Sequence, residues 1–179
     1  MKKTAKKAVV CCLGGSKLKE GAERKSFAGG CAEILTACPD GLLECASGCL
    51  GGGSCVKACR LGAVSIGANN AAVIDRGRCV GCGLCVKACP QHIIHLLPAG
   101  SVMTQRCSSH AKGADTARQC ASGCIGCGVC QKNCPAGAIT IQDGLAVIDY
   151  ELCISCGMCA VKCPRGAIKD ASGIFSKAV

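Results

Sequence analysis

The chain has 179 residues, of which 22 are cysteine and only three are aromatic, and its formal net charge is +10. A cysteine content of about 12% excludes an ordinary globular protein and leaves two classes, a secreted disulfide scaffold or a metal protein. So little aromatic surface can hardly stabilise small modules alone, so we expect an inorganic group to replace much of the core.

The positive charge does not by itself indicate a nucleic-acid partner. A charge of this size would ordinarily suggest binding to nucleic acid or to an anionic membrane. If about sixteen cysteines bind four [4Fe-4S] clusters as thiolates, the net charge of the loaded protein falls to about +2. The basic residues then mostly compensate for the clusters, and no nucleic acid is expected.

The beginning of the chain contains a short apolar run, 8–13, which ends at Gly14. A secretory signal needs an uninterrupted apolar region, and a membrane helix needs about 18 to 20 apolar residues, which no stretch of the sequence provides. We therefore expect a cytoplasmic protein that does not span a membrane.

The sequence repeats itself once. The stretch Cys45-Ala-Ser-Gly-Cys49 recurs 75 residues later, from Cys120 to Cys124. We expect an α+β fold with two tandem bacterial-type 2[4Fe-4S] ferredoxin-like modules behind a small N-terminal segment. In chain order the predicted units are an N-terminal cysteine-containing segment (1–44), ferredoxin-like module 1 (45–97), a connector (98–119), ferredoxin-like module 2 (120–170) and a tail (171–179).

Local patterns predict short elements within these units. A short apolar strand ends at Cys12, and a helix-like stretch begins at Cys31. Alternating apolar residues interrupted by Gly or Asn predict β-hairpins at 63–75 and 138–149. One-turn helices are expected just before the prolines that stop them, Pro90, Pro135 and Pro164.

Three cysteine runs fit the spacing C-x2-C-x2-C-x3-C-P, which is typical of bacterial [4Fe-4S] ferredoxins. The runs are Cys79/Cys82/Cys85/Cys89, Cys124/Cys127/Cys130/Cys134 and Cys153/Cys156/Cys159/Cys163. The first three thiolates of a run reach three irons of one cluster, and the fourth ligates the other cluster of the pair. The alternatives are zinc knuckles, whose C-x2-C pairs are separated by a dozen or more residues, and a set of intracellular disulfides.

This exchange of the fourth ligand predicts which cysteines share a cluster. In module 2 the predicted sets are Cys124, Cys127, Cys130 and Cys163, and Cys134, Cys153, Cys156 and Cys159. In module 1 the first run departs from the pattern, because Gly52 stands where the repeat places Cys127 and Arg60 replaces the proline. We expect Cys45 to supply the missing thiolate, so the sets become Cys45, Cys49, Cys55 and Cys89, and Cys59, Cys79, Cys82 and Cys85.

Six cysteines remain outside these four sets: Cys11, Cys12, Cys31, Cys38, Cys107 and Cys120. We expect Cys12, Cys31, Cys107 and Cys120 to bind a fifth cluster that attaches the N-terminal segment to module 2. Cys11 would face away from Cys12 on a strand, and the sequence does not decide whether it or Cys38 is a ligand. The alternative is that all six are free buried thiols.

No catalytic residue is predicted. None of His92, His95 and His110 has an acid or a nucleophile at motif spacing, and we expect surface or packing roles for them. No glycine-rich motif follows a strand in the way that a flavin or nicotinamide site requires. A lysine precedes the last ligand of every run, at Lys57, Lys87, Lys132 and Lys162. We expect these lysines to form a solvated helix face; the alternatives are that they favour reduced clusters or dock an acidic partner.

The stretches 8–14, 48–59, 105–109 and 123–127 resemble the cytoplasmic part of the B subunit of the Rnf complex, the ion-translocating ferredoxin:NAD oxidoreductase. The resemblance extends over nearly the whole sequence. Members of that family usually begin with a membrane helix and a further cysteine cluster domain, and this sequence contains neither.

The resemblance implies an electron-relay subunit that is cytoplasmic or peripheral to a membrane complex. Such a subunit would pass single low-potential electrons between ferredoxin and a flavoprotein or other oxidoreductase subunit, and its partners would perform the chemistry. Two alternatives are a shortened subunit of a membrane Rnf-type complex and a free polyferredoxin carrier. Co-purification of a flavoprotein, with or without a membrane anchor, would separate the three hypotheses.

Overall fold

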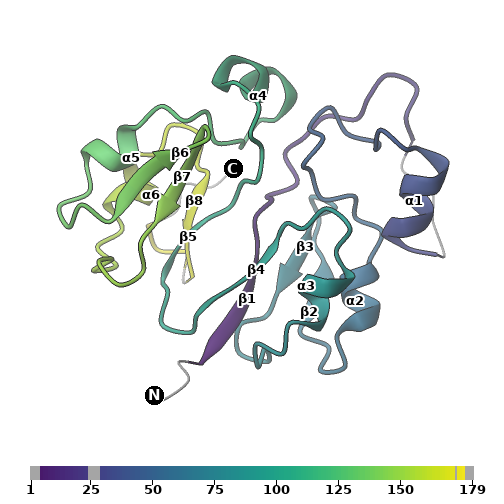
Figure 1. Ribbon diagram of the computed structural model, residues 1–179, viewed down its shortest axis with the longest axis horizontal. Coiled ribbons are helices and arrows are strands. Elements are labelled where there is room, and N and C mark those ends of the chain that lie inside the picture. Colours follow the sequence, from purple (N-terminus) through teal and green to yellow (C-terminus); the bar gives the residue numbers. More distant parts are fainter. Residues whose placement is uncertain (1–4, 24–28, 172, 176–179) are drawn as a thin grey trace.

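Two lobes of similar build lie side by side in the computed structural model, which describes residues 5–23, 29–171 and 173–175 (Figure 1). Parts of the predicted N-terminal segment and of the predicted tail lie outside these residues. Short helices and short strands alternate in both lobes, which confirms the predicted α+β class.

The first lobe has the element order β-α-β-β-α-β. Its elements are β1 (Lys6–Val10), α2 (Ser54–Ala58), β2 (Val64–Ile66), β3 (Ala72–Ile74), α3 (Leu84–Ala88) and β4 (Ile94–Pro98). Strand β1 pairs antiparallel with β4, so that Val10 faces Ile94, and β2 pairs with β3. Ala8 and Val10 are buried in the core of this lobe. The predicted N-terminal segment is therefore not separate, because its first strand completes the first lobe.

The second lobe repeats this order. Its elements are β5 (Met103–Gln105), α5 (Val129–Lys132), β6 (Ile139–Gln142), β7 (Leu145–Ile148), α6 (Met158–Lys162) and β8 (Ile168–Asp170). Strand β5 pairs antiparallel with β8, and β6 pairs with β7. The region predicted as a connector thus supplies the first strand of the second lobe. The hairpins β2–β3 and β6–β7 confirm the two predicted from the sequence.

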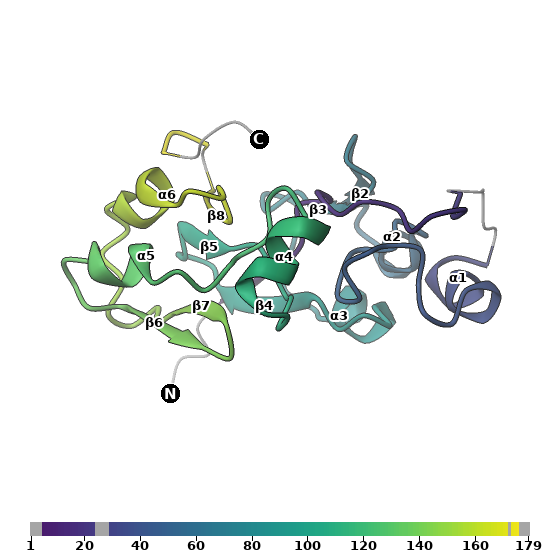
Figure 2. The same cartoon turned by 90° about the horizontal axis from the view of Figure 1, so that it is seen from above.

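Each lobe carries an insertion between its first strand and its first cysteine helix. The insertion of the first lobe contains α1 (Cys31–Ala37), and that of the second contains α4 (Gly113–Gln119). Figures 1 and 2 show α1 at the far end of the first lobe and α4 near the middle of the molecule. None of the helices in the described part of the chain has the length and apolar composition that a membrane span requires.

The lobes are related by a pseudo-symmetry that is visible in their hydrogen bonds. The N–H of Cys11 donates to Ile93 O (2.7 Å), and the N–H of Arg106 donates to Ala167 O (2.8 Å). Cys11 and Arg106 are therefore equivalent, each being the first residue after the first strand of its lobe. They also connect the lobes, because Cys11 Sγ donates to Gln105 O (3.5 Å) and Arg106 Nε donates to Val10 O (2.5 Å).

Candidate iron–sulfur sites

The third cysteine of each run lies at the beginning of a short helix. Helices α2, α3, α5 and α6 each start after a glycine with positive φ, such as Gly83 (φ 79°) before α3. This left-handed turn costs little only for glycine. It directs the chain from the cysteine loop into the helix and buries the thiols of Cys55, Cys85, Cys130 and Cys159.

The outer site of the first lobe is a cavity of about 280 Å³ lined by Cys59, Cys79, Cys82 and Cys85. These are the cysteines that the exchange of the fourth ligand assigns to one cluster. Backbone N–H groups donate to two of their sulfurs, from Ala8 to Cys79 (3.4 Å) and from Ala63 to Cys59 (3.3 Å). Donors of this kind stabilise thiolates, as a cluster ligand requires.

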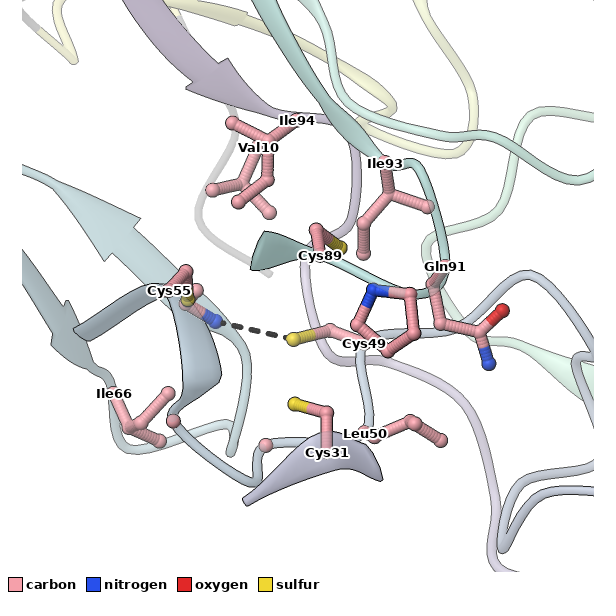
Figure 3. A pocket seen from close by; sticks show the side chains of 14 residues that line it. Val10, Cys31, Cys49, Leu50, Cys55, Ile66, Cys89, Gln91, Ile93 and Ile94 are labelled. Carbon is pink, nitrogen blue, oxygen red and sulfur yellow. Dashed lines mark hydrogen bonds between the residues drawn. The ribbon is translucent and has the colours of Figure 1, made fainter. Parts of the chain in front are cut away.

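The inner site of the first lobe brings together Cys31, Cys49, Cys55 and Cys89 (Figure 3). The N–H of Ala72 donates to Cys49 Sγ (3.4 Å). Burial raises the pKa of Cys55 to about 12, and the neighbouring thiols of Cys49, Cys31 and Cys89 add to the shift. The sequence predicted Cys45 as the fourth member of this set, but Cys31 lies here instead.

Gly52 explains why Cys31 reaches this site. A Cβ at position 52 would lie 2.7 Å from the backbone N of Cys31 and 2.8 Å from Ile34 Cδ1. The start of α1 therefore packs where a side chain would stand, and Cys31 N donates to Ser54 Oγ (2.9 Å). The missing side chain makes room for a cysteine from a distant segment.

We predict that Gly52→Ala displaces the start of α1 and weakens the inner site. The added methyl group has no free space, so the free energy of unfolding should fall by roughly 1–3 kcal/mol. The iron content, measured by elemental analysis after anaerobic purification, should fall by about four atoms per chain. Gly100→Ala is the control, because a Cβ there meets nothing within 4 Å. Equal iron content and stability in both variants would contradict this account.

A further cavity, the bridging site, lies between the lobes and is lined by Cys12, Cys45, Cys107 and Cys120. The sequence grouped Cys31, not Cys45, with the other three. The N–H groups of Gly14 (3.4 Å) and Cys49 (3.3 Å) donate to Cys12 Sγ. Burial raises the pKa of both Cys45 and Cys107, whereas backbone N–H donors to each sulfur lower it.

The bridging site follows the pseudo-symmetry of the lobes. Cys12 and Cys107 each stand second after the first strand of a lobe, and each accepts the N–H two residues on, from Gly14 and Ser109, both at 3.4 Å. Cys45 and Cys120 occupy the same place in the sequence repeat. Each lobe therefore contributes two equivalent cysteines.

The inner site of the second lobe is lined by Cys124, Cys127, Cys130 and Cys163, as the spacing predicted. The N–H of Ala167 donates to Cys163 Sγ (3.3 Å). Burial raises the pKa of Cys130 to about 11, with the nearby thiol of Cys124 as the next cause.

By equivalence with the first lobe, the cysteines expected at the outer site of the second lobe are Cys134, Cys153, Cys156 and Cys159, as the spacing predicted. The N–H of Ala138 donates to Cys134 Sγ (3.3 Å), as Ala63 does to Cys59. Burial raises the pKa of Cys159 to about 11, and the thiols of Cys153 and Cys156 contribute.

Two cysteines belong to none of these groups of four. Cys11 is buried at the contact between the lobes and also lines the bridging cavity, but its thiol donates to Gln105 O. Burial raises the pKa of Cys11 to about 11. Cys38 follows α1 and packs against an apolar cluster that contains Ile34 and Leu50. Both therefore behave as packing residues.

The thiol groupings fit [4Fe-4S] clusters in donor type and number, since each cluster takes four cysteine thiolates. Within the described ranges, no three His, Cys, Asp or Glu side chains converge tightly enough to hold a single metal ion. All three histidines line a different cavity between the lobes, of about 510 Å³, together with Tyr150.

Two arginines that were not predicted from the sequence lie at the cysteine sites: Arg106 lines the bridging site, and Arg165 lines the second inner site. Alignment of the two halves, which places Arg165 opposite Gln91, could have found the second of them.

Comparison with known families gives two matches. A 4Fe-4S dicluster domain family matches residues 47–93 and 123–167, just over half of the chain, and a second 4Fe-4S dicluster domain family matches residues 78–138. A chain of the formate dehydrogenase, heterodisulfide reductase and formylmethanofuran dehydrogenase complex from Methanospirillum hungatei is 24% identical, with a TM-score of 0.27, and the match covers 68% of this chain and 51% of that one.

Three curated relatives are B subunits of ion-translocating complexes. The B subunit of the proton-translocating ferredoxin:NAD(+) oxidoreductase complex of Clostridium ljungdahlii is 49% identical over 60% of this chain and 38% of that protein. The B subunit of the ion-translocating oxidoreductase complex of Methanosarcina acetivorans is 42% identical over 68% and 46%. The B subunit of the Na(+)-translocating ferredoxin:NAD(+) oxidoreductase complex of Acetobacterium woodii is 36% identical over 68% and 36%.

The aligned part of this chain spans less than half the length of each of these relatives. Their similarity confirms the resemblance to Rnf-type B subunits that the sequence motifs indicated. Except for Cys31, the cysteines of the inner and outer sites all fall within the two matched segments, so the chain belongs to the 4Fe-4S dicluster domain family and is a homologue of Rnf-type B subunits.

Proposed function

We propose that this chain is an electron-transfer subunit with five [4Fe-4S] clusters arranged in series through two ferredoxin-like modules. The observation that carries the proposal is that sixteen cysteines line four cavities in groups of four. The equivalence of the lobes places four more in a fifth group, and every group has backbone N–H donors near its sulfurs. Bound clusters of this type accept and release single electrons at low potential.

We assign the ligands of four sites by the cavities they line, and those of the second outer site by equivalence with the first lobe. The assigned sets are Cys59, Cys79, Cys82 and Cys85 (first outer); Cys31, Cys49, Cys55 and Cys89 (first inner); Cys12, Cys45, Cys107 and Cys120 (bridging); Cys124, Cys127, Cys130 and Cys163 (second inner); and Cys134, Cys153, Cys156 and Cys159 (second outer). The twenty residues are those predicted from the sequence, with Cys31 and Cys45 exchanged.

Contacts between neighbouring sites support this order. Helices α2 and α3 pack together, as do α5 and α6, which joins the inner and outer sites of each lobe. The N–H of Cys49, a first inner ligand, donates to Cys12 of the bridging site. On the other side, the N–H of Cys124 lowers the pKa of Cys107 by hydrogen bonding to it. The bridging site is thus in direct contact with both inner sites.

The protein groups around these sites exclude water and aim donors at sulfur. Ala72, Ile93 and Ile94 are buried beside the first inner site. N–H groups directed at sulfur stabilise the added negative charge of a reduced site and so raise its potential. Cys82 and Cys156 of the outer sites are exposed, and so is Cys127 of the second inner site. Electrons can therefore enter or leave at both ends of the series and also at the second inner site.

The relatives support a proposal about the partners of this chain. Two of the three relatives named above belong to ferredoxin:NAD(+) oxidoreductase complexes. By analogy, this chain would pass electrons between ferredoxin and a flavoprotein or other oxidoreductase subunit, at the periphery of a membrane complex. A shortened subunit of a membrane Rnf-type complex and a free polyferredoxin carrier are the alternatives, and anaerobic co-purification with identification of the bound proteins would decide between them.

Iron and sulfide analysis tests the number of clusters. We predict about 20 iron atoms and about 20 acid-labile sulfides per chain after anaerobic purification, because five clusters contain four of each. About 16 of each would leave the bridging site without a cluster. Zinc in place of iron would refute the proposal.

A further inference from the structure

The cysteine sites differ in the charge of their other lining residues. Arg106 lines the bridging site and Arg165 lines the second inner site. Among the described residues, no Asp or Glu lines either cavity, and the first inner site is lined by no charged side chain other than its thiols. Arg60 lines the first outer site but is exposed, so solvent screens its charge.

Hydrogen bonds hold both guanidinium groups in place. Arg106 Nε donates to Val10 O (2.5 Å), which holds the side chain across the contact between the lobes. Arg165 Nε donates to Gly123 O (3.4 Å), and its Nη2 donates to the carbonyl oxygen of Cys120. Arg165 therefore connects the second inner site with a bridging-site cysteine. Both side chains are partly buried.

The equivalent positions of the first lobe are uncharged. Cys11 corresponds to Arg106 through the matching backbone hydrogen bonds that follow β1 and β5. Gln91 corresponds to Arg165, because each stands two residues after the last cysteine of its lobe's final run, and Gln91 lines the first inner site. The pseudo-symmetry of the ligands is thus not shared by the charges around them.

We propose that Arg106 and Arg165 raise the reduction potentials of the bridging and second inner sites above that of the first inner site. Uptake of one electron adds one negative charge to a site. A fixed guanidinium stabilises that charge, and more strongly in a partly buried setting than in water. An electron that enters the series is therefore most stable on the bridging site or the second inner site. The inference rests on the proposed function, since it requires loaded sites.

The test is an anaerobic redox titration with dithionite and mediators, followed by electron paramagnetic resonance, on the loaded full chain. Arg106→Gln and Arg165→Gln should each lower the potential of the most easily reduced signals. We expect the ratio of reduced to oxidised sites at a fixed potential to fall about tenfold, which corresponds to about 59 mV for one electron. Arg106→Lys keeps the charge and should largely restore the wild-type potential.

The pseudo-symmetry supplies a reverse experiment. Gln91→Arg adds a guanidinium at the first inner site and should raise the potential of one further signal, whereas Gln91→Ala should not. If Arg106→Gln loses iron, Gln91→Arg decides: an upward shift supports the inference and an unchanged potential overturns it. A wild-type iron content near that of four clusters would count against the proposed function, whereas unmoved potentials in fully loaded variants would overturn this inference alone.

Discussion

Removal of all iron by a chelator under anaerobic conditions is expected to unfold both lobes. The described sheets are each two-stranded, and such sheets are marginal in water without further packing. Cysteines form a large part of both cores, including Cys49, Cys55 and Cys79 in the first lobe and Cys130 in the second. Structural zinc contributes about 10–16 kcal/mol in zinc-finger peptides, as much as the whole stability of many domains, and we expect cluster binding to be similarly decisive here.

Far-ultraviolet circular dichroism, recorded as iron is withdrawn, measures this effect. The signal of the folded chain should be lost in parallel with the iron. Reconstitution with iron and sulfide under reducing conditions should restore it, which serves as the control for irreversible damage. A chain that keeps a native-like spectrum after complete iron removal would show that the protein core is sufficient alone.

Pairs of cysteine substitutions should reveal which thiols share a site. Cys45→Ser and Cys120→Ser should each lower the iron content from about 20 to about 16, and the double variant should stay near 16, because both residues belong to the bridging site. Cys31→Ser combined with Cys120→Ser should fall to about 12, because two sites are lost. The same anaerobic iron analysis measures all four variants.

The grouping predicted from the sequence alone gives the opposite pattern. With Cys45 in the first inner site and Cys31 in the bridging site, the Cys45/Cys120 pair would lose two clusters and the Cys31/Cys120 pair one. Cys38→Ser is the matched control, since Cys38 packs against apolar residues and should leave the iron content unchanged. The experiment therefore separates two assignments that involve the same twenty residues.

Local sequence patterns were sufficient to predict much of the secondary structure and most of the cysteine groups. The three regular runs predict tight cysteine loops, because ligands separated by two or three residues must lie on one loop, whatever surrounds it. The alternating apolar residues between the runs predict the two hairpins, and the prolines predict where the short helices end. The repeat likewise predicts two lobes, and the dicluster family matches fall on both. The motif from 105 to 109 indicated the Rnf relationship without any structural information.

The tertiary structure decided what depends on distant segments. Strand β1 belongs to the first lobe because it pairs with β4, almost ninety residues later, and no local pattern reports such a pairing. Cys31 lies at the first inner site, where the sequence predicted Cys45, because the start of α1 fits against the bare backbone of Gly52. Cys45 lies at the bridging site instead. In the sequence, Gly52 only stands where the repeat places a cysteine, whereas in the folded chain its bare backbone leaves the space in which Cys31 reaches the first inner site.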